Sequence, residues 1–131
     1  MSVVDLHRSI ELAAERGDIY PAIYDAYFER CAGSRELMQL TDVHMRGRML
    51  DSLFELLLAD DVAAQLSYLR FETKNHMSWG VQLNMYENLL SAVRDTVRES
   101  CSTQWTPAMA AQWDAHIATL VAEIRATLAA V

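Results

Sequence analysis

The chain has 131 residues, which is enough for one domain with a continuous hydrophobic core and room for a small cofactor. It carries 11 Lys and Arg against 18 Asp and Glu, and the resulting net charge of -7 repels a phosphate backbone, so nucleic acid is not an expected partner. Cys31 and Cys101 fit no disulfide or zinc-site spacing, and no run approaches the ~20 apolar residues of a membrane span, so we expect a cytoplasmic protein with no membrane partner.

Helical periodicity begins close to the N-terminus. Apolar residues recur every three or four positions, which predicts a first helix over residues 3–16 that ends at Gly17. A second helix is expected to start directly afterwards, because Asp18 can cap it and Pro21 is tolerated in its first turn. Its inward stripe runs from Ile23 to Cys31.

The next two predicted helices differ in length. A short helical piece is expected over residues 35–40, after the turn Ala32-Gly33-Ser34. Thr41-Asp42 are good capping residues, and they precede a longer helix whose apolar stripe runs from Met45 to Leu58. Asp60-Asp61 marks the break that is expected to end this helix.

Three further helices complete the pattern. One is expected from Val62 to about His76, with Gly80 ending that region. The next runs from Leu83 to about Ser100, and the last begins at Thr106-Pro107, a capping residue followed by proline at the first helical position. We therefore expect an all-α fold of about six to eight helices in one domain, residues 1–131.

The stretch from Lys74 to Leu90 has His76 at the end of one helix, Gly80-Val81 after it and Tyr86 in the next helix. This order resembles the haem-ligand segment of bacterial globins. In their flavohaemoglobin-like branch, a proximal histidine ends one helix and a Gly-Val or Gly-Ile corner follows. A tyrosine then lies in the first turns of the next helix. His76, Gly80-Val81 and Tyr86 stand in this order here.

The likeness covers nearly the whole chain, because the second helix contains Tyr24 and Phe28 and the last helix carries Trp113 after Thr106-Pro107, as in such globins. It implies a globin-like fold around a haem pocket, with haem b (iron protoporphyrin IX) as the cofactor and His76 as the metal ligand. The residues that the resemblance implies around the haem are Tyr24, Phe28, Met38, Arg46, Met49, Leu50, Leu69, His76, Val81 and Tyr86.

The side of the pocket opposite His76 leaves more than one interpretation open. Tyr24 could donate a hydrogen bond to bound oxygen, or it could be a core tyrosine bonded to a backbone carbonyl. Tyr20 or Tyr27 could take the inward position instead. Arg46 is expected at the pocket mouth or on a solvated helix face. Taken alone, His76 is also consistent with a capped or half-exposed histidine.

Three functions from different classes are compatible with these residues. The first is a haem-binding globin that reversibly binds diatomic gases (O2, NO or CO). It would need a separate reductase for nitric oxide dioxygenase-like activity, because the sequence has no GxGxxG or βαβ pattern. The second is a globin-fold sensor that signals through a partner, with or without haem, since Leu37, Met38 and Leu40 stand where many globins place a haem-stacking phenylalanine. The third is an all-α interaction module in which His76 is structural.

Two more expectations concern the molecular surface. His7 and His116 fall on outer helices and are expected to titrate in solvent, whereas His44 is expected to face away from Arg46. The last two helices are expected to form a homodimer, because they have more apolar residues than one face needs. These residues are Val93, Trp105, Trp113 and Ile117.

Overall fold

Seven α-helices make up most of the chain that the computed structural model describes, residues 2–59 and 65–130. Their bounds are α1 Val4–Glu15, α2 Tyr20–Arg30, α3 Ser34–Leu37, α4 Val43–Leu58, α5 Leu66–Ser78, α6 Leu83–Cys101 and α7 Pro107–Ala129, with a short 3-10 turn, η2, at Ser102–Gln104. These residues contain no strand, so the predicted all-α class is confirmed, and none of their helices is long and apolar enough to cross a membrane. The predicted break at Asp60-Asp61 and helix start at Val62 lie outside the described residues.

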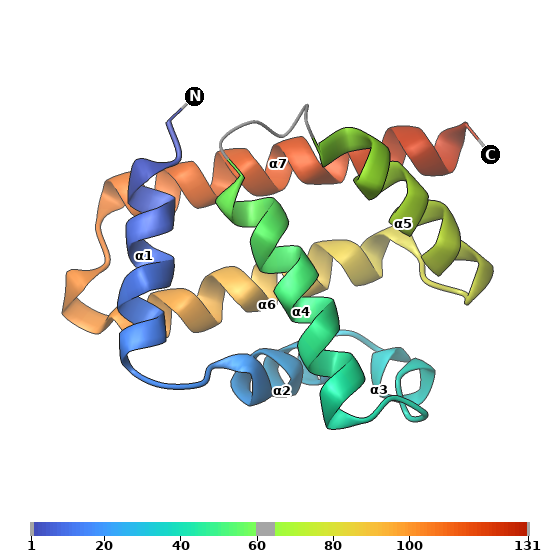
Figure 1. Cartoon of the computed structure of the whole chain (residues 1–131), viewed down its shortest axis with the longest axis horizontal. Helices are drawn as coiled ribbons and strands as arrows, with labels where there is room; N and C mark the ends of the chain where they lie inside the picture. Colours follow the sequence, from blue (N-terminus) through green and yellow to red (C-terminus); the bar gives the residue numbers. More distant parts are fainter. Residues whose placement is uncertain (1, 60–64, 131) are drawn as a thin grey trace.

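The two longest helices form the centre of the arrangement. α6 and α7 run antiparallel, and α1 packs against both of them near one end (Figure 1). α2 packs along α6, and α5 packs against α7 at the end far from α1. α4 crosses in front of α6 in this view and lies between α1 and α5. α4 and α5 therefore face each other on one side of the molecule.

The apolar side chains of these helices form one continuous core. Its largest fully buried side chains include Trp113, Leu6, Ile23, Leu50, Leu57 and Leu120. Each buried side chain of this size stabilises the fold by ~1.5–3 kcal/mol relative to an exposed one. The Trp113 indole Nε1 donates to the Ser9 hydroxyl at 2.8 Å, and Ser9 donates to the Leu6 carbonyl at 2.6 Å. The largest core residue thus ties α7 to α1 with its polar atom satisfied.

Local capping explains where several helices begin and end. The Asp42 carboxylate accepts from the Met45 N–H at 2.8 Å at the start of α4, and the Thr106 hydroxyl accepts from the Met109 N–H at 3.1 Å at the start of α7. Gly17 follows α1 with a φ of 121°, in the region that favours glycine. The predicted caps at these positions are confirmed.

The short helix differs from its prediction. α3 spans Ser34–Leu37 instead of residues 35–40. The Met38 carbonyl accepts from the Thr41 N–H at 3.0 Å, from the Thr41 hydroxyl at 2.6 Å and from the Arg46 guanidinium at 3.2 Å. Because these groups satisfy the carbonyl outside a helical ladder, the chain leaves the helix early.

The prediction that His116 titrates in solvent is wrong, and His7 is also partly covered. The His116 side chain is 6% exposed, and the Nε2 atoms of both residues are buried. His44 lies on the exposed side of α4, as expected. Periodicity shows which residues share a helix face, but it does not show how many faces are covered. α7 is covered by α1, α5 and α6, so a residue off its main stripe is still buried.

The apolar residues on which the dimer prediction rests pack inside the protein's own core. Val93 and Trp113 are both 0% exposed, and Trp105 and Ile117 pack against the core. α6 and α7 have wide apolar faces because several helices cover them, so these faces are no argument for a second copy. Homodimer formation stays a prediction without that support.

Candidate functional site

His76 lies in the last turns of α5, at the corner that leads to α6. Its carbonyl accepts from the Trp79 N–H at 3.0 Å and from the Val81 N–H at 3.1 Å. Gly80 has a φ of 90°, and a Cβ placed there would lie 3.8 Å from Leu37 Cδ1, so α3 borders this corner. The predicted order of helix end, glycine corner and next helix is confirmed at this position.

The imidazole of His76 turns one nitrogen into the protein. Nδ1 is buried, has no hydrogen-bond partner among the described residues, and lies 3.9 Å from Glu72 Oε2 one turn earlier in α5. The Tyr86 ring of α6 meets the imidazole edge-on, with ring centroids 6.3 Å apart and planes at 78°. Since Nδ1 is turned toward the carboxylate, Nε2 is the nitrogen left for a ligand.

Tyr86 adds an unusual polar group beside His76. Its hydroxyl is buried and makes no hydrogen bond of good geometry within the described residues. Burial raises the pKa of Tyr86 to about 12, although the nearby Thr73 hydroxyl acts in the opposite direction. Thr73 is itself 0% exposed and donates to the Leu69 carbonyl at 2.7 Å. The structure thus brings Tyr86 to His76, as the resemblance implies.

Tyr24 is buried on the inward face of α2, but its hydroxyl already has a partner. The side chain is 6% exposed, and the hydroxyl donates to the Arg46 carbonyl of α4 at 2.9 Å. Burial raises the pKa of Tyr24 to about 12, while the Arg46 charge acts in the opposite direction. Of the two interpretations left open by the sequence, this arrangement is the tyrosine bonded to a backbone carbonyl.

Arg46 joins several of the predicted pocket residues into one cluster. Its guanidinium carbon lies 5.2 Å from the Phe28 ring centroid and 5.7 Å from that of Tyr24, within the range of cation–π attraction. Its Nε donates to the Thr41 hydroxyl at 2.7 Å, and its terminal nitrogen donates to the Met38 carbonyl at 3.2 Å. Arg46 is therefore not a solvated side chain, and its guanidinium is not free at a pocket mouth. Its contacts hold the connection between α3 and α4 against α2.

The two other tyrosines that could have replaced Tyr24 have different surroundings. Tyr20 stacks on Phe54 with ring centroids 5.7 Å apart and donates to the Asp51 carboxylate at 2.6 Å. Burial and that carboxylate raise the pKa of Tyr20. Tyr27 is 5% exposed, and its pKa is raised mainly by burial. Only the Tyr24 hydroxyl, among these three, contacts the Arg46 carbonyl.

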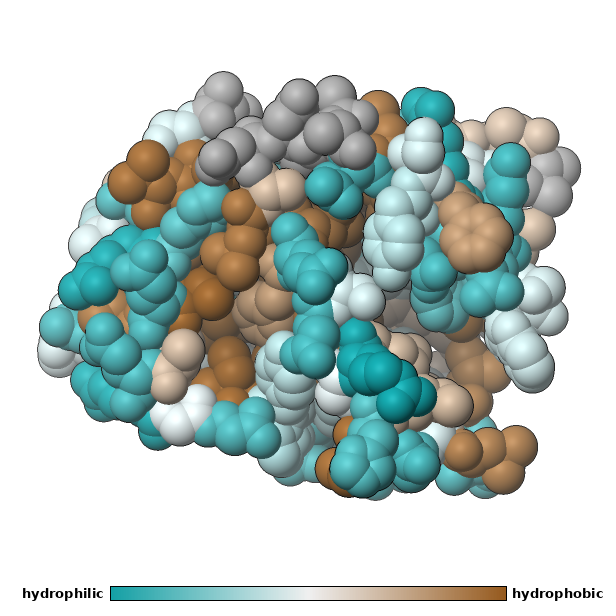
Figure 2. Space-filling model, in the orientation of Figure 1, coloured by the Kyte–Doolittle hydropathy of each residue, from teal (hydrophilic) through white to brown (hydrophobic). Residues whose placement is uncertain are grey.

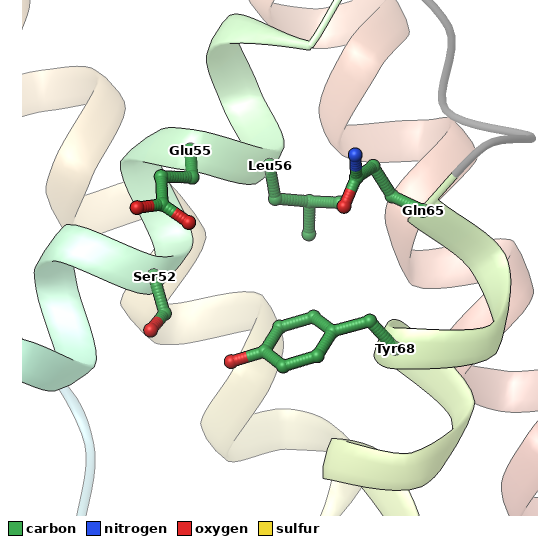
Figure 3. Close-up of a pocket in the computed structure, with 5 residues that line it drawn as sticks. All are labelled: Ser52, Glu55, Leu56, Gln65 and Tyr68. Atoms are coloured by element: carbon green, nitrogen blue, oxygen red, sulfur yellow. The ribbon is translucent and has the colours of Figure 1, made fainter.

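A pocket of about 230 Å³ opens between α4 and α5 (Figure 3). It is lined by Ser52, Glu55 and Leu56 of α4 and by Gln65 and Tyr68 at the start of α5. The Tyr68 phenol reaches toward α4 in Figure 3, and Figure 2 shows the surface hollowed between the two helices. Neither His76 nor any other residue of the predicted haem pocket lines it. It is smaller than the ~300–1,000 Å³ of most small-molecule sites.

The remaining predicted pocket residues belong mainly to the core. Leu50 and Leu69 are 1% and 8% exposed, Met49 packs against the core, and Val81 is half-buried. Met45, at the start of the predicted apolar stripe of α4, is 42% exposed. Most of these side chains thus fill the interior between helices, and none of them lines the pocket between α4 and α5.

Two residues near His76 were missed at the sequence level. Glu72 and Thr73 precede His76 by four and three positions, and that spacing places them on the same face of a helix. This spacing is the feature of the sequence that could have identified both residues. Among residues 2–59 and 65–130, no group of three or more His, Cys, Asp and Glu side chains could hold a metal ion.

Comparison with known proteins gives no family assignment. No protein-family model matches the chain, and no curated protein matches its sequence.

Proposed function

We propose that the chain is a haem-binding globin that reversibly binds a diatomic gas, with haem b held by His76. The observation that carries the proposal is the setting of this single imidazole at a helix end, with Nδ1 buried 3.9 Å from Glu72 and Nε2 left for a metal. A haem iron needs only one protein ligand on each side, so a cluster of ligating side chains is not required.

The residues beside His76 fit such a group. A carboxylate near Nδ1 orients an imidazole and strengthens its donation to a metal through the other nitrogen. Two apolar side chains of α5 and of the corner after it are also exposed: Phe71 is 65% exposed and Trp79 72%. An apolar ligand between α4 and α5 would cover surface of this kind. Because the present pocket is small, binding would require these two helices to part.

Bound haem would supply an iron atom with an open coordination position for the gas. The protein groups on the opposite side are already engaged, since Tyr24 donates to the Arg46 carbonyl and Arg46 donates to Thr41 and Met38. A hydrogen bond from Tyr24 to a bound gas would therefore require the phenol to leave the Arg46 carbonyl. While these contacts are intact, neither Tyr24 nor Arg46 would donate a hydrogen bond to the bound gas.

The test is a haem titration of the purified protein followed by its Soret absorption band. We expect wild type and His44→Ala to bind haem, because His44 is exposed on α4. His76→Ala should lose the band or bind far more weakly, with its helix content unchanged by circular dichroism. Undiminished haem affinity in His76→Ala would sink the proposal. A wild-type protein without a Soret band would instead favour a globin-fold regulatory protein that acts through a partner.

A further inference from the structure

A second pocket, of about 240 Å³, lies between α1, the start of α2 and α4. Figure 2 shows apolar atoms in the hollow between α1 and α4. The pocket shares no residue with the predicted haem pocket or with the pocket between α4 and α5. The residues that line it are Ile10, Ala14, Gly17, Asp18, Ile19, Tyr20 and Phe54.

An aromatic pair and two isoleucines make most of this pocket apolar. Tyr20 of α2 stacks on Phe54 of α4, with ring centroids 5.7 Å apart and planes at 12°. Ile10 of α1 and Ile19 at the start of α2 are partly buried and pack against the core. A hydrocarbon placed against these side chains would be removed from water, which stabilises it in proportion to the area covered. The pocket therefore suits a small apolar group.

Two carboxylates lie beside the aromatic pair. The Tyr20 N–H donates to Asp18 Oδ1 at 3.0 Å, and the Tyr20 hydroxyl donates to Asp51 Oδ1 at 2.6 Å. Both acidic side chains are exposed at the rim, so each has an oxygen that can meet a ligand from the solvent side. Within the described part of the chain, neither carboxylate forms an ion pair with a lysine or arginine, and no basic residue lines the pocket.

The charges at the rim select the sign of the ligand. A ligand anion would be repelled by Asp18 and Asp51 and by the net charge of -7 of the chain, whereas a cation would be attracted. A cation over an aromatic ring face is attracted by the ring as well. We propose that this pocket binds a small organic amine, with its hydrocarbon part against Ile19 and Phe54 and its ammonium group beside Asp18 and Asp51 at the Tyr20 edge.

The first measurement compares three ligands that have a hydrocarbon of similar size and different charge. Pentylamine, 1-pentanol and pentanoate are titrated into the full chain without haem at about pH 7, where the amine is positive and pentanoate negative. The NMR shifts of the Ile10, Ala14 and Ile19 amides report the binding. We expect pentylamine to bind most tightly and pentanoate most weakly. Binding of pentanol or pentanoate as tight as that of pentylamine would overturn the proposal, as would unchanged amide shifts with pentylamine.

The second measurement removes one charge at a time. Asp18→Asn and Asp51→Asn keep an oxygen that accepts from Tyr20, so the pocket should keep its shape. Because exposed ion pairs are weak, each variant should raise the dissociation constant of pentylamine by about two- to fivefold and leave that of pentanol unchanged. Asp25→Asn, at an exposed aspartate of α2 outside the pocket, changes the net charge equally and should bind pentylamine as wild type does. Equal weakening in all three variants would refute the site.

The third measurement fills the pocket. Ala14 lines it but is exposed, so Ala14→Leu should fold normally and prevent binding of both pentylamine and pentanol. Ala111→Leu, at an exposed alanine of α7 outside the pocket, is the control and should bind both ligands as wild type does. Undiminished binding of pentylamine to Ala14→Leu would place the amine elsewhere and overturn the proposal. Because no haem is present, these results are independent of whether the proposed gas-binding function is correct.

Discussion

Tyr24 has one hydroxyl proton, and its partner decides what the residue can do. In the structure that proton goes to the Arg46 carbonyl, 22 positions later in the sequence. Helical spacing predicted that Tyr24 faces inward, because the neighbours on its own helix define the stripe. It did not predict the partner, because the carbonyl belongs to another helix whose placement depends on the whole core.

We expect Tyr24→Phe to lower the free energy of unfolding by ~1 kcal/mol, because one buried hydrogen bond between α2 and α4 is lost. In haem-loaded protein, the oxygen dissociation rate should stay unchanged, since the hydroxyl is directed at the backbone. Urea denaturation and stopped-flow measurements check the two effects. Tyr68→Phe, at a tyrosine that is 44% exposed, serves as the control for stability and should leave the free energy of unfolding unchanged. Faster dissociation from the Tyr24 variant would mean that the phenol turns toward the gas.

Ser9 offers a second test at the level of a single atom. Ser9→Ala removes the acceptor for the indole N–H of Trp113, which is 0% exposed and has no access to water. Leaving this donor unpaired should lower the stability by ~1–3 kcal/mol. Ser67→Ala, on the exposed side of α5, is the matched control and should show no loss in the same urea denaturation experiment. Equal stability of the two variants would contradict the role given to this hydrogen bond.

Replacing either of two glycines with alanine should change the stability, but in opposite directions, because their backbone conformations differ. Gly80 connects α5 to α6 with a φ of 90°, so Gly80→Ala should destabilise the protein by ~1–2 kcal/mol. Gly47 lies within α4, and a Cβ there would meet nothing within 4 Å, so Gly47→Ala should stabilise it by ~0.5–1 kcal/mol. Thermal unfolding of both variants checks the pair. The idea fails if the two substitutions shift the midpoint in the same direction.

The N-terminal cap of α7 gives another test of an element boundary. Thr106→Ala removes the acceptor for the Met109 N–H and should lower the stability by ~1 kcal/mol. Thr103→Ala, at an exposed threonine in η2, changes the same side chain without removing a cap, and should be nearly neutral. Thermal unfolding of the two variants measures the difference. A loss in both would assign the effect to the η2 segment as a whole.

Element boundaries were the most predictable part of this fold, for a local reason. Capping at Thr106 and the corner at Gly80 depend on residues close in sequence, so both can be predicted from the sequence alone. The early end of α3 depends on side-chain contacts of the Met38 carbonyl, and the burial of His116 depends on contacts between distant helices. Periodicity encodes neither. The same difference holds for the candidate site. The position of Tyr86 near His76 was expected, whereas the contacts that Arg46 makes with its neighbours were not.

Across the whole molecule, α5 is the long helix with the smallest share in the core. Only 2 of its 13 residues are buried, against 6 of 19 in α6. Its exposed face carries Phe71, which is 65% exposed, and its ion pair to α7 joins partly exposed side chains and adds little stability. The helix that carries His76 therefore has few buried side chains to hold it in place, and we expect it to move relative to α4 when a large planar ligand binds between them.

Hydrogen exchange of the whole chain tests this order of stability and the proposed cofactor together. Without haem, we expect α5 to exchange faster than α6 and α7, because fewer buried contacts oppose its local opening. Haem at about 100 times its dissociation constant stabilises the bound state by ~2.7 kcal/mol, so α5 should be slowed by up to about a hundredfold. His76→Ala should show little of this protection at the same haem concentration, whereas His44→Ala should match wild type. If α5 were as protected as α6 without haem, the proposed order of opening would be wrong. If haem gave a Soret band and left α5 exchange unchanged, His76 would not be its ligand.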